Sequence, residues 1–172
     1  MRLGSSEANA VIYPEPPMAQ VQEIGVIQLR HNDQAPYLAR EAVRIWLGAE
    51  HPAHEIAVLA ASELVTNAVR YAGTSSADAT SFPIMLRLSQ RQEYLRLTVT
   101  DPGSSCSEPA RIPLQAPSLY SERGRGLAIV ENLSRNRWGS YRLLASGHRV
   151  IWCHLDLNPT PAQLAELFHT TV

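Results

Sequence analysis

The sequence of 172 residues contains no lysine, and all fifteen of its basic residues are arginine. P-loop NTPases use the lysine of a Gly-Lys-Ser/Thr signature, and ordinary protein kinases use a strand lysine, to contact nucleotide phosphates. The absence of lysine therefore excludes both classes, together with Schiff-base chemistry. The formal net charge is -1, whereas non-specific nucleic-acid binders have an excess of basic residues that displaces counterions. We therefore expect no direct nucleic-acid binding.

Cysteine and long apolar runs are scarce as well. Cys106 and Cys153 are too few for a disulfide scaffold in a chain of this length, and the absence of a Cys-x-x-Cys pair argues against a zinc site. No stretch reaches the ~20 apolar residues that span a bilayer, and the N-terminal residues contain no apolar core of signal-peptide length. The sequence therefore predicts a soluble cytoplasmic protein with no membrane contact.

Hydrophobic residues make up 45% of the sequence and charged residues 18%, which is typical of one packed domain. The proline-bearing residues 1–22 are expected to form a flexible leader. Residues 23–158 are expected to form the domain itself. Residues 159–172 are expected to form a C-terminal tail helix that begins at Pro161 and has Thr160 as its cap.

Apolar periodicity predicts the elements of this domain. Alternating apolar residues indicate strands over 23–30, 82–89, 93–101, 137–144 and 149–157. Apolar residues three or four apart indicate helices over 33–48, 52–72 and 124–136, the first of them capped by Asp33. Because strands and helices do not alternate one for one, we expect an α+β fold rather than a doubly wound one. The predicted architecture is a two-layer sandwich, with a mostly antiparallel mixed sheet and the helices on one face.

The second predicted helix carries Glu63 and Asn67, which are four residues apart and so share one face. That face also bears apolar residues, so both polar side chains point toward the core side, where burial without a partner would cost several kcal/mol. A hydrated Mg²⁺ is a suitable partner, because the carboxamide oxygen of Asn67 is a hard ligand and Glu63 could then orient or deprotonate a hydroxyl. A solvated helix edge with two polar residues is the ordinary alternative.

Two further motifs are built around glycine. Asp101 and Gly103 follow a predicted strand, where the carboxylate could accept from an amine-bearing ligand and the glycine would allow close approach. The second motif joins the long segment 102–123 to a helix N-terminus, a suitable cradle for phosphate. Its members are Arg123, Gly124, Arg125, Gly126 and Leu127. Taken singly, the first motif could be an ordinary turn and the second a hinge.

The three motifs in this order resemble those of Bergerat-fold ATP-binding domains, the superfamily of gyrase and sensor histidine kinases. The matching residues are Glu63-x-x-x-Asn67-Ala68, Asp101-x-Gly103 and Gly124-x-Gly126-Leu127. The greatest similarity is to the small anti-sigma-factor serine/threonine kinases and their actinobacterial relatives. That resemblance also rests on the runs Arg125-Gly126-Leu127-Ala128-Ile129-Val130 and Val150-Ile151-Trp152-Cys153-His154-Leu155, and it covers roughly residues 24–157.

The resemblance implies a role for each matching residue. Asn67 would coordinate the Mg²⁺ that bridges the triphosphate of ATP, and Glu63 would be the base that activates the acceptor hydroxyl. Asp101 would accept a hydrogen bond from the adenine amino group, and Gly103 would floor the adenine pocket. Beside a cation the pKa of Glu63 should be depressed, so its main role would be orientation.

The resemblance also assigns the phosphate-binding end. Gly124, Gly126 and nearby amides, including that of Leu127, would hold the phosphates, and residues 102–123 would form the ATP lid. Because no lysine is available, Arg123 or Arg125 would supply the positive charge.

Two positions depart from the pattern of the family. Ser105 stands where the family often has a second glycine, and Gly147-His148-Arg149 stands where a threonine is common.

The function implied is a serine/threonine protein kinase that uses ATP and Mg²⁺ to phosphorylate a small anti-sigma-factor antagonist protein. Sequestration of a sigma factor and formation of a homodimer are further expectations from the same resemblance. The alternative is a regulatory binding module, in which nucleotide changes the affinity for a protein partner with little or no kinase activity.

Overall fold

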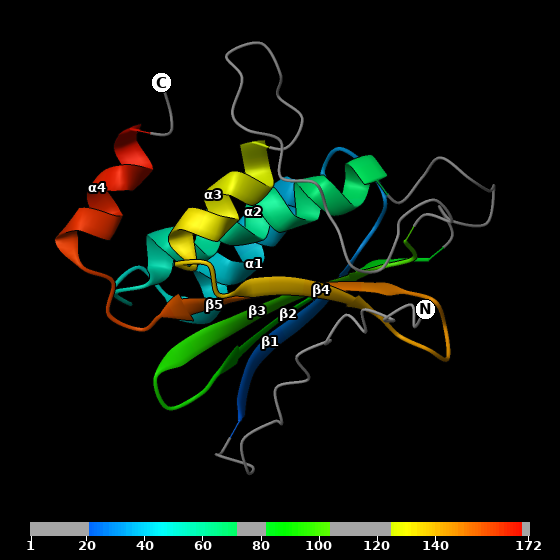
Figure 1. Ribbon diagram of the computed structural model, residues 1–172, viewed down its shortest axis with the longest axis horizontal. Coiled ribbons are helices and arrows are strands. Elements are labelled where there is room, and N and C mark those ends of the chain that lie inside the picture. Colours follow the sequence, from blue (N-terminus) through cyan, green and yellow to red (C-terminus); the bar gives the residue numbers. More distant parts are fainter. Residues whose placement is uncertain (1–20, 72–81, 104–124, 170–172) are drawn as a thin grey trace, which may run out of the picture.

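The computed structural model describes residues 21–71, 82–103 and 125–169. Its elements are β1 (Gln22–Leu29), α1 (Ala35–Leu47), α2 (His54–Tyr71), β2 (Ile84–Gln90), β3 (Tyr94–Asp101), α3 (Arg125–Leu133), β4 (Trp138–Arg142), β5 (Arg149–Asp156) and α4 (Pro161–His169). The described strands form one sheet in the order β1-β2-β3-β5-β4, and each pairing is antiparallel. Figure 1 shows α1, α2 and α3 on one face of this sheet, which confirms the predicted α+β sandwich.

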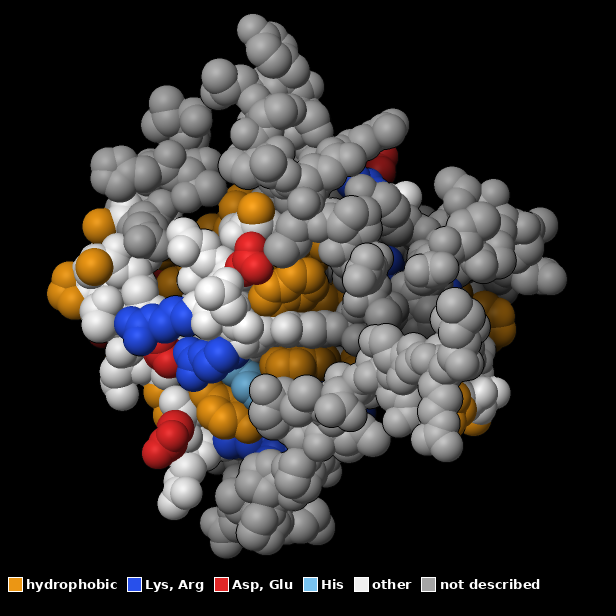
Figure 2. All heavy atoms as spheres, viewed as in Figure 1, with side chains coloured by type: hydrophobic (Ala, Val, Ile, Leu, Met, Phe, Trp, Pro, Cys, Tyr) orange, Lys and Arg blue, Asp and Glu red, His pale blue; other side chains and the backbone are white. Residues whose placement is uncertain are grey.

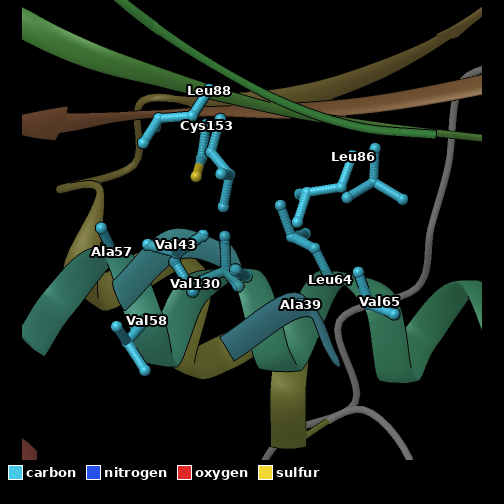
Figure 3. Close-up of a cluster of buried hydrophobic side chains, with 14 of the residues drawn as sticks. Ala39, Val43, Ala57, Val58, Leu64, Val65, Leu86, Leu88, Val130 and Cys153 are labelled. Atoms are coloured by element: carbon cyan, nitrogen blue, oxygen red, sulfur yellow. The ribbon is translucent and has the colours of Figure 1, made fainter. Parts of the chain in front are cut away.

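The core lies between the helices and the sheet. Leu64 of α2 points toward Leu86 of β2, and Val130 of α3 and Cys153 of β5 belong to the same cluster (Figure 3). These side chains are fully buried because each apolar helix stripe matches the alternating apolar face of the strands. Burial raises the pKa of the Cys153 thiol to about 12, so this cysteine is an unreactive core residue.

Helix boundaries differ from those predicted by one to three residues, and two of the differences have a local cause. Asp33 does not cap α1: Gln34 occupies the N-cap position without a side-chain cap, and Oδ1 of Asn32 accepts from the Gln34 N–H at 3.1 Å. Helix α3 ends at Leu133 rather than 136, because Arg135 and Asn136 adopt positive φ angles that a right-handed helix cannot contain.

The tail helix α4 begins as predicted. The Gln163 N–H donates to the Thr160 hydroxyl oxygen at 3.4 Å, and the Thr160 N–H donates to Oε1 of Gln163 at 2.7 Å. This reciprocal pair is a capping box. The predicted leader lies outside the described residues, apart from its last two positions. None of the described helices is both long and apolar enough to cross a membrane.

The sheet face that points away from the helices carries an aromatic stack. The ring of His154 stacks on Tyr94 at a centroid distance of 4.0 Å and lies 4.7 Å from the ring of Trp152. Figure 2 shows arginine side chains gathered near a histidine at the end of the sheet where β5 ends. The pKa of His154 is lowered to about 4, mainly by burial and in addition by the charges of Arg96, Arg137 and Arg91.

We predict that His154 makes folding sensitive to acid. Between about pH 6.5 and pH 4 the unfolded chain binds a proton at His154 and the folded chain does not, so stability is lost as the pH falls. His154→Phe keeps an aromatic ring and removes this titration. The free energy of unfolding of the parent should fall relative to that of the variant by on the order of 1–2 kcal/mol across this window, allowing for partial exposure. Urea denaturation at several pH values measures the free energy of unfolding of both proteins. A difference between parent and variant that does not change with pH would contradict the prediction.

Candidate functional site

Helix α2 brings Asn67 into the protein interior. Its neighbours on the helix, Leu64 and Ala68, are fully buried against the sheet, and Asn67 itself is only 7% exposed. Within the described residues, Nδ2 of Asn67 has no hydrogen-bond partner. A buried amide left unsatisfied costs about 1–3 kcal/mol. The position therefore marks a place where a polar ligand would complete the structure.

Glu63 lies one helical turn before Asn67 on α2 and is half-buried. Burial raises the pKa of Glu63, while the nearby charges of Arg70 and Arg40 partly oppose that shift. This direction applies to the site without a bound cation, and the depression expected beside Mg²⁺ stays a prediction. In this structure the Glu63 carboxylate is a stronger base than a solvated glutamate, which suits proton acceptance as well as orientation.

Gly126, in the first turn of α3, lies against the Glu63 carboxylate. A β-carbon placed on Gly126 would lie 2.5 Å from Oε2 of Glu63, closer than any side chain can approach without displacing its neighbour. The absence of a side chain at this residue allows α3 to pack here. The structure thus joins the Glu63–Asn67 motif to the second glycine motif, although they are far apart in sequence.

Asp101 ends β3 and is the other buried acid of the site, with a side chain that is 0% exposed. Its Oδ1 accepts from the Gly103 N–H at 2.7 Å. Gly103 has a φ of 71°, in the left-handed region that favours glycine, so the turn after the strand depends on this residue. Figure 1 shows that α2 ends at the same end of the sheet as β3.

Arg149 forms an ion pair with Asp101 that the sequence analysis did not predict. Its Nε and Nη2 donate to Oδ2 of Asp101 at 3.1 and 2.8 Å, and its side chain is 8% exposed. The two residues lie directly opposite each other in the ladder between β3 and β5, so the strand register dictates the contact. The sequence analysis noted Arg149 only as a replacement in a turn that often holds threonine.

The remaining predicted residues divide into two groups. Leu127 is 4% exposed and belongs to the hydrophobic core, so its side chain anchors α3 and only its backbone remains for a ligand. Arg125 begins α3. Arg123, Gly124 and most of the predicted lid 102–123 lie outside the described residues.

Positive charge surrounds the described part of the site. Arg40 donates to the Ser62 hydroxyl at 2.7 Å and, with Arg70, acts on Glu63, while Arg149 stands at the Asp101 end. Within the described ranges no three His, Cys, Asp or Glu side chains gather closely enough to hold a metal ion. A cation bound at Asn67 would therefore need further coordinating atoms from a bound molecule, such as phosphate oxygens. This is the usual mode of binding for Mg²⁺.

Comparison with known proteins bears on this arrangement. Residues 30–152 match the model of the histidine kinase-like ATPase domain, a range that covers more than half of the chain. The range includes Asn67, Glu63, Asp101, Gly126 and Arg149. No curated protein is similar enough to the chain to count as a match.

Proposed function

Because the chain belongs to the histidine kinase-like ATPase domain family, whose name implies ATP binding, we propose that it is a serine/threonine protein kinase that uses ATP and Mg²⁺. The observation that carries the proposal is the buried amide of Asn67 beside Glu63, with Gly126 of α3 against the Glu63 carboxylate. A buried carboxamide whose Nδ2 lacks a partner within the described residues, beside a half-buried carboxylate, fits a site for a magnesium nucleotide and a proton acceptor.

The donor chemistry of the site fits Mg²⁺. The carboxamide oxygen of Asn67 is a hard ligand of the kind that Mg²⁺ prefers, and the unpartnered Nδ2–H of the same buried group would suit an acceptor such as a phosphate oxygen. Asn67 would hold the cation, and Glu63 could orient its water. When bound, Mg²⁺ neutralises charge on the phosphates and so favours transfer.

Glu63 performs the proton chemistry in the proposed reaction. The hydroxyl oxygen of a serine or threonine attacks the γ-phosphorus, the bond between that phosphorus and the oxygen of ADP breaks, and the hydroxyl proton passes to the Glu63 carboxylate. Burial of Glu63 raises its pKa and so favours this acceptance, whereas a cation at Asn67 would act in the opposite direction. In this proposal Asp101 contacts the nucleobase and Gly126 lies beside the phosphates, so the nucleotide would lie along α2.

The acceptor in this proposal is a small protein antagonist of an anti-sigma factor. Sequestration of a sigma factor by the chain, and pairing of two copies, belong to the same proposal. Its support is the sequence resemblance to anti-sigma-factor kinases and the family match.

Thermal unfolding with nucleotide tests the site directly. ATP at 100 times its dissociation constant should stabilise the parent by about 2.7 kcal/mol and raise Tm by several degrees, more with Mg²⁺ than without it. Asn67→Ala should lose the Mg²⁺-dependent part of the shift, because it removes the carboxamide oxygen. Asn158→Ala, an exposed asparagine beyond the family match, is the control and should behave as the parent. An Mg²⁺-dependent shift that Asn67→Ala retains would remove Asn67 from the metal site.

A further inference from the structure

Arg149 forms an ion pair with the carboxylate of Asp101, which the proposed function assigns to contact with the nucleobase. Both Nε and Nη2 of Arg149 donate to Oδ2 of Asp101, and the Gly103 N–H donates to Oδ1. A carboxylate oxygen accepts about two hydrogen bonds, so Oδ2 is fully engaged and Oδ1 keeps one acceptor position. An unpaired aspartate would instead present only acceptors and a full negative charge.

The guanidinium keeps a donor that the ion pair does not use. Within the described residues no hydrogen bond leaves Nη1 of Arg149. Arg149 is also the more exposed member of the pair, at 8% against 0% for Asp101, so a ligand would meet the guanidinium first. Because Asp101 is fully buried behind it, the guanidinium donor is what the pair offers to a ligand, and the pair carries little net charge.

We propose that Arg149 and Asp101 read the nucleobase as a pair, and that the site therefore accepts purines with a carbonyl at position six as well as adenine. This inference rests on the proposed nucleotide site. Adenine offers an amine donor at position six beside the acceptor N1, whereas guanine and hypoxanthine offer a carbonyl acceptor beside an N1–H donor. Nη1 of Arg149 can donate to N1 of adenine or, after a shift of the base, to the carbonyl oxygen of a six-oxo purine, whereas an unpaired carboxylate would leave that oxygen facing like charge.

Gly103 lies beside the stem of Arg149. A β-carbon on Gly103 would lie 3.5 Å from Cβ of Arg149 and 3.6 Å from the Gly147 carbonyl oxygen, which are ordinary van der Waals distances. Arg149 is held instead by its two hydrogen bonds to Asp101 and by the burial of its side chain, so the donor is in place before a ligand arrives.

Equilibrium binding of ATP, GTP and ITP to the full chain in Mg²⁺ tests the inference. The parent should bind all three with dissociation constants within about tenfold of one another. Arg149→Thr removes the guanidinium donors, its hydroxyl lies on a much shorter side chain, and the Asp101 carboxylate is left without its ion pair, so binding of GTP and ITP should weaken relative to that of ATP by about tenfold or more. Arg149→Lys keeps a charged donor and should keep most of the tolerance, which preserves the test where the threonine variant does not fold.

The control is Arg137→Thr, which removes an ion pair with Asp156 at the opposite end of β5 and should leave the preference unchanged. A parent that prefers ATP over both GTP and ITP by more than about 100-fold would overturn the inference while leaving the proposed function intact. Equal tightening of all three nucleotides by Arg149→Thr would also overturn it, because Arg149 would then only block the site. Binding of no nucleotide by the parent would overturn the proposed function, and this inference with it.

Discussion

Replacing Glu63 with glutamine should slow phosphoryl transfer by about 10²–10⁴-fold while leaving ATP binding nearly unchanged. Glutamine has almost the same shape, so it should keep the packing of α2 and the contact with Gly126, but it cannot accept the hydroxyl proton. The measurement is release of ADP from ATP, with water or an added antagonist protein as the acceptor, beside a binding titration with ATP.

Glu55→Gln is the matched control for this variant. Glu55 lies on the same helix, in its first turn, and its side chain is 73% exposed. Its replacement should change neither transfer nor binding. If Glu63→Gln transfers phosphate at the parental rate, Glu63 is not the base. If the parent binds ATP but transfers nothing to any acceptor, the chain is the alternative regulatory binding module.

The transfer rates of the parent and of Glu63→Gln should also differ in their dependence on pH. Burial holds the pKa of Glu63 above that of a solvated glutamate, and Arg70 and Arg40 oppose the shift only in part. The carboxylate must be ionised to accept a proton, so the parental rate should fall as the pH is lowered through the pKa that Glu63 has in the loaded site. The residual rate of Glu63→Gln should lack that fall.

The architecture and the α2 motif could be predicted because both depend on local periodicity. A four-residue spacing fixes Glu63 and Asn67 on one helix face whatever the rest of the chain does, and the structure places both residues there. Alternating apolar residues likewise fixed each strand to within a few residues. Helix ends were less predictable, since Asn32 rather than Asp33 supplies the side-chain acceptor before α1.

The contacts between motifs could not be read from the sequence, because they depend on pairing across the sheet. The hairpins β2–β3 and β4–β5 follow from short connections, whereas β3 and β5 are not consecutive, and their register alone places Arg149 opposite Asp101. A sequence shows an aspartate after one strand and an arginine before another, without showing that they meet. The contact of Gly126 with Glu63 similarly depends on how α3 docks on α2.

That docking leads to the second prediction of large effect: Gly126→Ala should impair transfer far more than stability. The added methyl would stand 2.5 Å from Oε2 of Glu63, the free end of a flexible side chain that can swing away. Stability should change by no more than about 1 kcal/mol, since alanine is also the better helix former. Displacement of the carboxylate by about 1 Å is enough to cost about 10²-fold in rate.

A double-mutant cycle separates this mechanism from a general loss of packing. If the methyl acts by moving the Glu63 carboxylate, it has no further effect once the base is gone, so Gly126→Ala with Glu63→Gln should be about as slow as Glu63→Gln alone. If the methyl instead disturbs α3 and the phosphate end of the site, the two losses should multiply and ATP binding should weaken as well. Rates for the four proteins, measured with saturating ATP, decide between these outcomes.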